Sequence, residues 1–275
     1  MSPAPNVVLN NGVEIPQLGY GVFKVPAEET RQAVLTALDA GYRLIDTAAM
    51  YGNEAEVGIA VRESGLLRDE VFVTTKVWYT DQGYDRTMRA FDASMDRLGF
   101  DMLDLYLIHW PNAARDLYVE TWSAMERLYL DGRVRAIGVS NFQPEHLRRL
   151  VDESEVVPVI NQVELHPYLQ QSEVRKADDE LGVRTEAWAP IARGGALLRD
   201  PVVVGLADKH GRTPAQVVLR WHVQTGNVVI PKSVTPARVK ENADIFDFSL
   251  GEEDMSALGR LDRGERTGPH PDRMG

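Results

Sequence analysis

The sequence predicts an α/β fold, the (β/α)8 or TIM barrel, in which eight parallel strands form a ring inside a ring of helices. Three observations support this fold. Eight short β-rich runs alternate with helical stretches along the 275 residues, which is more than a six-stranded open sheet would use. The runs start about 30 residues apart, which is the length of one strand–helix–strand unit. They are also nearly continuous in apolar residues, as is typical of parallel strands buried on both faces.

A hairpin is expected before the first alternation. The runs 7–9 and 13–15 flank Asn10, Asn11 and Gly12, a turn sequence that suits positive φ. We expect this hairpin to plug the bottom of the barrel. The eight barrel strands are then expected over residues 18–23, 43–47, 71–77, 103–109, 134–140, 158–165, 183–188 and 228–232.

The stretches between the strands carry helix signals. Apolar residues recur at helical spacing over 88–98 and 147–151. Residues 213–216 form a capping box with proline at the first helical position, and Gly226 is expected to end that helix. Pro144 and Pro236 are also placed as first-turn prolines are. We expect residues 1–275 to form one barrel domain, with residues 262–275, rich in Gly, Pro and charge, as its tail.

Composition limits the partners of the protein. Lys and Arg number 30 and Asp and Glu 41, which gives a net charge of −11. This balance argues against nucleic acid or an anionic membrane, because either requires a basic face. The absence of cysteine excludes disulfides and thiolate nucleophiles. No signal-peptide pattern and no apolar stretch of about 18 residues occurs, so we expect a cytoplasmic monomer that binds a small molecule.

Polar residues collect where barrel strands end, and barrel enzymes carry their chemistry at this face. Asp46 ends the second strand, Tyr51 follows it, Lys76 lies near the end of the third, and His109 ends the fourth. Taken singly, the Asp fits a helix cap, and the Tyr and His fit core packing. A Lys inside an apolar run is costly to bury without a partner. Together the four residues predict an acid site in which an anion holds a lysine beside a phenol.

Five sequence motifs carry a resemblance to a known family. They are DTAAMYGNE at 46–54, LIHWP at 107–111, GVSNF at 138–142, NQVELHP at 161–167 and IPKS at 230–233. In this order and spacing they resemble the aldo-keto reductase superfamily nearly from end to end. Phe23, Trp188 and the short loops look most like the prokaryotic branch that includes 2,5-diketo-gluconate reductases. Many members have Tyr in place of Trp188 and Trp in place of Phe23, so the substrate pocket is expected to differ from theirs.

The resemblance implies a role for each matching residue. Asp46, Tyr51, Lys76 and His109 would form the catalytic tetrad. Ser140, Asn141 and Gln162 would hold the nicotinamide carboxamide of NADPH, and Trp188 would stack on its ring. The adenosine phosphate and adenine would be surrounded by Lys232, Ser233, Val234, Arg238, Glu241 and Asn242. An apolar mouth for the substrate would be lined by Phe23, Trp78 and Trp110.

The implied reaction is reversible hydride transfer from NADPH to the carbonyl carbon of an aldehyde or ketone, such as a dicarbonyl or a keto-sugar. A phenol has a pKa near 10, and we expect Lys76 to lower that of Tyr51 so that it can donate a proton. Asp46 would pair with Lys76, and a neutral His109 would hydrogen-bond the substrate oxygen. NADPH is expected over NADH because cations at 232 and 238 can meet its 2′-phosphate.

Other interpretations remain open at this point. Lys76 could form a Schiff base with a carbonyl substrate, or the barrel could bind nucleotide without turnover. Glu164 and His166 share a strand face, but no third ligand is evident, so no metal is expected. The run 193–195, Arg-Gly-Gly, fits a phosphate loop and a flexible loop equally well. No Gly-x-Gly-x-x-Gly fingerprint follows a strand, which leaves a Rossmann cofactor site unsupported.

Overall fold

The computed structural model describes residues 4–274, so the parts of the predicted N-terminus and tail at residues 1–3 and 275 lie outside it. Its main sheet contains eight parallel strands, each bonded to the next one along the chain. The strands are β3 (Tyr20–Gly21), β4 (Leu44–Asp46), β5 (Phe72–Val77), β6 (Leu103–Ile108), β7 (Val134–Ser140), β8 (Ile160–Glu164), β9 (Arg184–Trp188) and β10 (Val228–Val229).

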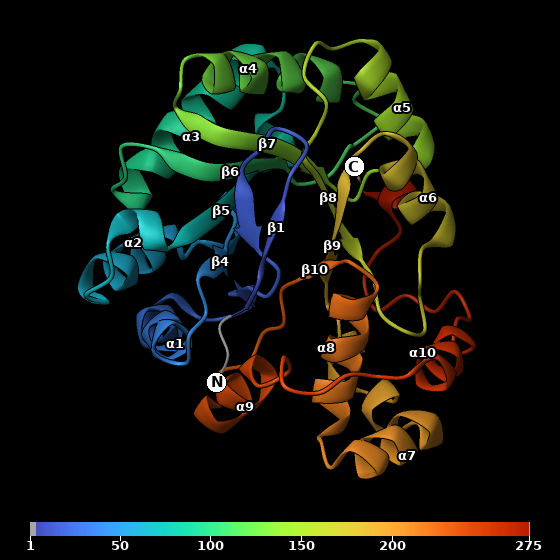
Figure 1. The fold of residues 1–275 in the computed structure, drawn as a ribbon. Helices are drawn as coiled ribbons and strands as arrows, with labels where there is room; N and C mark the ends of the chain where they lie inside the picture. Colours follow the sequence, from blue (N-terminus) through green and yellow to red (C-terminus); the bar gives the residue numbers. More distant parts are fainter. Residues whose placement is uncertain (1–3, 275) are drawn as a thin grey trace.

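The sheet closes on itself beside its first and last strands. Leu18 pairs in parallel with Val229. The N–H of Gly19 donates to the carbonyl of Val229 at 2.8 Å, and the N–H of Gly21 donates to that of Pro231 at 3.1 Å. The predicted (β/α)8 barrel is therefore confirmed (Figure 1).

Helices surround the strands and follow them along the chain (Figure 1). They are α1 (Ala27–Asp39), α2 (Glu54–Glu63), α3 (Tyr84–Leu98), α4 (Tyr118–Leu130), α5 (Pro144–Asp152), α6 (Ser172–Glu180), α7 (Pro201–His210), α8 (Pro214–Gln224), α9 (Pro236–Ala243) and α10 (Glu252–Gly259). The capping box of α8 is confirmed, because Oε1 of Gln216 accepts from the N–H of Thr213 at 2.9 Å and Oγ1 of Thr213 accepts in return at 3.3 Å. None of the helices within 4–274 is long and apolar enough to cross a membrane.

The predicted hairpin consists of β1 (Asn6–Val8) and β2 (Glu14–Pro16) and lies across the N-terminal ends of the strands (Figure 1). Leu9 and Ile15 are buried in the same apolar cluster as the barrel interior. The amide of Asn10 donates to the carbonyl of Pro158 at 2.9 Å, just before β8. The hairpin therefore plugs the bottom of the barrel, as expected, and the other end remains for the site.

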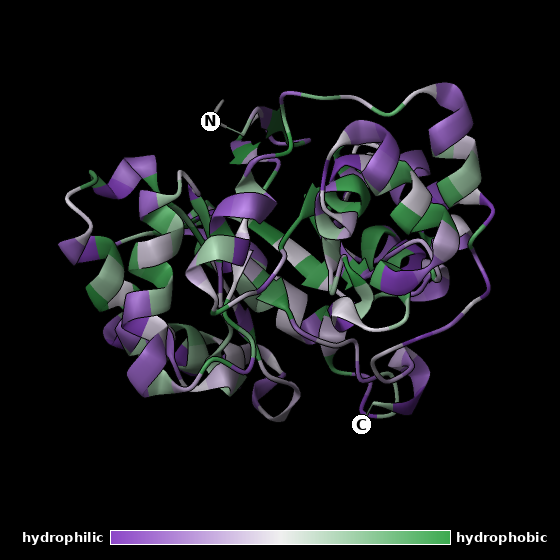
Figure 2. Cartoon of the chain, turned by 90° about the horizontal axis from the view of Figure 1, so that it is seen from below, coloured by the Kyte–Doolittle hydropathy of each residue, from purple (hydrophilic) through white to green (hydrophobic). Residues whose placement is uncertain are grey.

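The barrel interior changes from apolar to polar toward the C-terminal ends of the strands. Leu44 and Ile160 belong to the buried apolar cluster. Two residues later on the same strands stand Asp46 and Gln162, which are also buried and face the same side. Figure 2 shows hydrophobic residues concentrated on the inner strands and hydrophilic residues on the surrounding helices. A buried polar layer therefore separates the core from the open mouth.

One buried carboxyl group outside this layer links a helix to the barrel. Asp178 of α6 accepts from Nδ2 of Asn161 at 3.0 Å and from Oγ1 of Thr185 at 2.7 Å. Burial raises the pKa of Asp178 to about 7, although these two hydrogen bonds act in the opposite direction. Since this pKa lies above its ordinary value, the folded protein keeps a proton that the unfolded chain releases. The contribution to stability is therefore complete at low pH and is lost as the pH rises through about 7.

Asp178→Asn should remove this loss, because a neutral amide can make both hydrogen bonds at every pH. Relative to the parent, the variant should gain about 1–3 kcal/mol of unfolding free energy between pH 5 and pH 8. Urea unfolding of both proteins at the two pH values measures this difference. Asp208→Asn, at an exposed position on α7, is the control and should show no such gain. A gain that is the same at both pH values would show that the proton on Asp178 is not its cause.

Candidate active site

A cavity of about 880 Å³ opens at the C-terminal ends of the strands. It is bounded by the ends of several strands, the loop after β9, the start of α9 and the tail. All residues expected to bind or react, except Lys76, line it. They are Phe23, Asp46, Tyr51, Trp78, His109, Trp110, Ser140, Asn141, Gln162, Trp188, Lys232, Ser233, Val234, Arg238, Glu241 and Asn242. The structure thus brings together residues that are up to 219 positions apart (242 − 23) in the chain.

Lys76 lies beneath the cavity, where it forms a buried ion pair. Its ammonium donates to Oδ1 and Oδ2 of Asp46, both at 2.7 Å, and to the carbonyl of Thr47 at 2.9 Å. The side chain of Lys76 is fully buried and that of Asp46 nearly so. These contacts explain how an apolar strand tolerates a lysine. Removing one partner would leave a buried charge uncompensated, which typically destabilises a protein by about 3–5 kcal/mol.

Tyr51 ends the short helical turn η1 (Ala49–Tyr51) after β4, and its ring lies over the ion pair. The ammonium of Lys76 is 5.3 Å from the ring centroid. Burial raises the pKa of Tyr51 well above its ordinary value, and the charges of Asp46 and Glu186 raise it further. The pKa of Tyr51 is therefore raised and not lowered as expected, because burial and the charges of Asp46 and Glu186 outweigh the charge of Lys76. Tyr51 consequently holds its proton at neutral pH.

His109 directly follows β6 and faces Tyr51 across the cavity. The two rings meet edge to face with centroids 5.6 Å apart, and Trp78 contacts the imidazole in the same way at 5.0 Å. Burial lowers the pKa of His109 well below its ordinary value, and the charge of Lys76 acts in the same direction. The imidazole is therefore neutral. Its Nδ1 is buried without a partner among residues 4–274, which favours the tautomer that carries the proton on Nε2.

The residues expected to hold a carboxamide are connected by hydrogen bonds. Oγ of Ser140 donates to the carbonyl of Gln162 at 2.7 Å. Asn141 has a positive φ of 63°, and its Nδ2 donates to the carbonyl of His109 at 2.9 Å and to Oγ of Ser140 at 3.0 Å. Oδ1 of Asn141 accepts from Nε1 of Trp188 at 2.9 Å. Asn141 therefore links His109, Ser140 and Trp188 and fixes their relative positions.

The tail contacts Trp188 as well as Asn141 does. A Cβ added at Gly268 would lie 2.5 Å from Cη2 of Trp188, so the backbone packs directly on the indole. Glu164 holds this segment by accepting from the N–H and Oγ1 of Thr267, both at 2.6 Å, and from the N–H of Gly268 at 3.1 Å. These bonds occupy the carboxylate that had suggested a metal ligand. The tail is thus part of the mouth, where Pro269 also lines the cavity.

The far end of the cavity is polar and carries cations. Lys232 and Arg238 are exposed side chains that line it, at the end of the barrel and on α9. Arg193 lines the cavity too, from the turn η4 (Ala192–Gly194), where its φ is +56°. The sequence left Arg193 undecided between a phosphate loop and a flexible loop, and the structure places it at the cavity. The two glycines that follow Arg193 were the sequence signal that could have placed it at a binding site.

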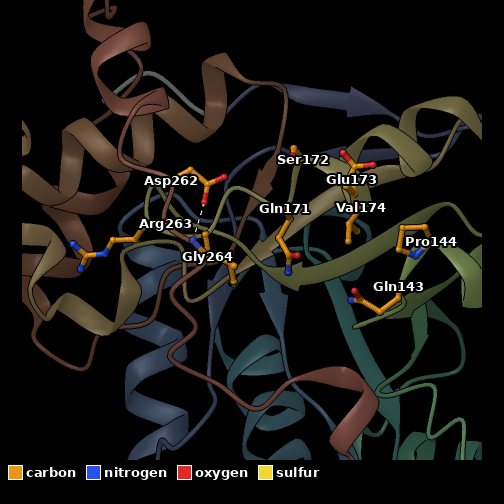
Figure 3. Close-up of a pocket in the computed structure, with 10 residues that line it drawn as sticks. Gln143, Pro144, Gln171, Ser172, Glu173, Val174, Asp262, Arg263 and Gly264 are labelled. Carbon is orange, nitrogen blue, oxygen red and sulfur yellow. Dashed lines mark hydrogen bonds between the residues drawn. The ribbon is translucent and has the colours of Figure 1, made fainter.

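A second, smaller cavity lies on the surface away from these residues. It has a volume of about 460 Å³ and lies between the N-terminal ends of α5 and α6 and residues 262–264 of the tail (Figure 3). Gln143, Gln171, Glu173 and Arg263 are among the side chains around it. None of its lining residues belongs to the predicted tetrad or cofactor set. The larger cavity is therefore the candidate active site.

The fold and this cavity together define an α/β-barrel enzyme whose acid–base residues lie at the C-terminal ends of its strands. The chain belongs to the aldo/keto reductase family, whose model matches residues 17–263.

Two bacterial relatives and one solved structure show how close the match is. Glyoxal reductase of Bacillus subtilis is 52% identical, with 98% of this chain and 96% of that protein covered. Methylglyoxal reductase DkgA of Escherichia coli is 48% identical over 98% of each chain. The crystal structure of a Gox0644 variant in complex with NADPH is 45% identical, covers both chains fully and has a TM-score of 0.95. The expected likeness to the prokaryotic branch is confirmed.

Proposed function

We propose that the protein uses NADPH to reduce the carbonyl group of small aldehydes and ketones to alcohols, with Tyr51 as the proton donor. One observation carries this proposal. A neutral phenol and a neutral imidazole, on Tyr51 and His109, face the same cavity above a buried Asp46–Lys76 pair. A carbonyl oxygen between the two rings would meet two donors while its carbon stays accessible from the cleft.

The residues of the cavity fit NADPH along its length. Gln162 leaves its Oε1 open to the cavity, where it can accept from a carboxamide. Trp188 offers an indole face that Asn141 and Gly268 hold in place. Lys232 and Arg238 supply positive charge for a phosphate at the other end. The bound cofactor would supply the hydride, which no side chain of this protein can do.

The protein's own residues account for the proton. Tyr51 keeps its proton until negative charge develops on the substrate oxygen and then donates it. The ammonium of Lys76, 5.3 Å from the ring, stabilises the phenolate that this transfer leaves behind. Nε2 of His109 donates a hydrogen bond to the same oxygen and fixes its position. Asp46 holds Lys76 in place, so each member of the tetrad has a separate task.

The shape of the mouth favours small substrates. Phe23 packs on Tyr51 with ring centroids 4.9 Å apart, and Trp78 and Trp110 complete an aromatic rim. The tail adds Pro269 to this rim. The glyoxal and methylglyoxal reductases among the relatives are named for small dicarbonyls, whereas a relative with 49% identity is named morphine 6-dehydrogenase.

We therefore expect glyoxal, methylglyoxal and polar keto-sugars to exceed a bulky steroid ketone in kcat/KM by at least about tenfold. The aromatic rim and the tail narrow the approach to Tyr51, so we expect small carbonyls to reach it more readily than large groups. Oxidation of NADPH, followed by its absorbance with each carbonyl in turn, measures the ranking. A steroid as the best substrate would contradict this view of the mouth. No oxidation with any carbonyl would instead favour a nucleotide-binding barrel without turnover.

The Schiff-base alternative conflicts with the surroundings of Lys76. A nucleophilic amine must be deprotonated and reach the substrate. The Lys76 side chain is fully buried, and its three N–H groups are all directed at acceptors on Asp46 and Thr47. Borohydride added with substrate should therefore leave the protein mass unchanged. A mass increase equal to the reduced substrate, lost in Lys76→Met, would support the imine instead.

A further inference from the structure

Beneath the tetrad lies a second buried carboxyl group, which the proposed reaction does not use. Glu186 of β9 is fully buried and lies level with Gln162 on the neighbouring strand β8. Nε2 of Gln162 donates to Oδ2 of Asp46 at 2.8 Å and to Oε2 of Glu186 at 3.0 Å. Both N–H groups of the Gln162 amide are therefore directed at carboxyl oxygens in the barrel interior.

These two contacts decide which way the amide of Gln162 points. The oxygens that face it from Asp46 and Glu186 both accept hydrogen bonds, so the NH2 group must lie on their side. The carbonyl oxygen Oε1 is then directed toward the cavity, which Gln162 lines. A flipped amide would place its oxygen against Oδ2 of Asp46, an acceptor in the ion pair with Lys76, and would leave its NH2 group facing the cofactor cleft. The resulting penalty is that of buried polar groups without partners.

We propose that Glu186 is a positioning residue that, with Asp46, holds the Gln162 amide so that Oε1 accepts a hydrogen bond from the N–H of the nicotinamide carboxamide. This inference rests on the proposed function, because it assumes that the cavity binds NADPH. Glu186 itself does not line the cavity and would act only through Gln162.

The surroundings of Glu186 indicate that it carries its proton near neutrality. Three side chains face Glu186: Asp46 from β4, Lys76 from β5 and the uncharged Gln162 from β8. On the other neighbouring strand, β10, Val228 pairs with Glu186 in register. Burial raises the pKa of Glu186 to about 8, and the charge of Asp46 also raises it. The hydrogen bond from Gln162 and the charge of Lys76 act in the opposite direction. Oε1 of Glu186 is buried with no partner in the described range, and an unpaired charged oxygen costs more to bury than an unpaired neutral one.

Two substitutions separate positioning from packing. Glu186→Gln replaces a neutral acid by a neutral amide of the same shape, whose oxygen can still accept from Gln162. Glu186→Leu keeps the bulk but removes the acceptor, so that one N–H of Gln162 has no partner and other rotamers compete. We expect NADPH affinity within about twofold of the parent for the first and about 3- to 10-fold weaker for the second at pH 7. Leu105→Met, a volume-conserving change in the barrel interior, is the control and should bind as the parent does.

The decisive probe is the 3-acetylpyridine analogue of NADPH, in which a methyl group replaces the amide nitrogen. It offers no N–H to Oε1 of Gln162, so the orientation of Gln162 should matter little to its binding. Tryptophan-fluorescence titration of both cofactors into the parent and the Leu variant measures the two losses. We expect the 3- to 10-fold loss for NADPH and less than about a twofold loss for the analogue.

Each outcome of this titration bears on a different claim. Equal losses for NADPH and the analogue would show that Glu186 only supports packing and would overturn the inference. Unchanged NADPH binding in Glu186→Leu, or a loss in Glu186→Gln as large as that in Glu186→Leu, would overturn it as well. A parent protein that binds neither cofactor would instead contradict the proposed function, so the two failures are distinguishable.

Discussion

Tyr51→Phe should reduce turnover by at least about 100-fold and leave NADPH binding within about threefold of the parent. The substitution removes the proton donor but keeps the ring that packs on Phe23 and lies over Lys76. Because burial and Asp46 keep the phenol protonated, its hydroxyl is available as an acid at neutral pH, and a phenylalanine ring offers no proton in its place. The loss should therefore appear in kcat, with little change in cofactor affinity.

Steady-state oxidation of NADPH with methylglyoxal, together with titration of NADPH by tryptophan fluorescence, measures both quantities. Tyr129→Phe on α4 removes a phenol far from the cavity and should behave as the parent does. Turnover of Tyr51→Phe close to that of the parent would mean that another group donates the proton.

Arg238→Ala should weaken NADPH binding by about 10- to 150-fold and change NADH binding little. The two cofactors differ by the 2′-phosphate. The net charge of −11 repels this phosphate at long range, so short-range contacts must supply the attraction that binds it. Arg238 is exposed at the polar end of the cavity, close to Lys232 and Ser233, and a guanidinium can bind two phosphate oxygens at once. The loss of one charge-assisted contact gives the expected range.

Titrating both cofactors into the parent and the variant determines whether the loss is selective. Lys240→Ala removes a cation from the same helix, α9, but not from the lining of the cavity, and should weaken NADPH binding far less. Losses of equal size for NADPH and NADH would show that Arg238 does not recognise the 2′-phosphate.

Local patterns in the sequence were sufficient for much of the fold. All eight barrel strands lie within or close to the predicted runs, and the helix starts at Pro144, Pro214 and Pro236 are as predicted. Apolar runs and proline caps act over a few residues, so one sequence can reveal them. The separate helix α7 was missed although Asp200 caps its start and Gly211 follows its end. Those signals were present, but the strict strand–helix alternation left no place for a second helix there.

That Asp46, Tyr51, Lys76 and His109 lie together could be predicted because they lie at or just after strand ends, and a parallel barrel gathers those ends at one face. The pKa of Tyr51 could not be predicted, since it depends on burial and on Glu186, which approaches from a strand 135 positions later (186 − 51). The tail contacts of Glu164 were equally inaccessible, because Thr267 is 103 positions away. Long-range side-chain contacts depend on how the loops fold over the barrel, and no local pattern encodes them.

Transfer of a deuterium label tests the central claim, direct hydride transfer in this cavity, most directly. NADPH that carries deuterium at both positions of its C4 atom is incubated with the parent protein and methylglyoxal, and the alcohol is analysed by mass spectrometry and NMR. We expect one deuterium on the newly formed carbinol carbon and one left on NADP+. NADPH consumption with an unlabelled alcohol, or an alcohol formed without NADPH consumption, would contradict it.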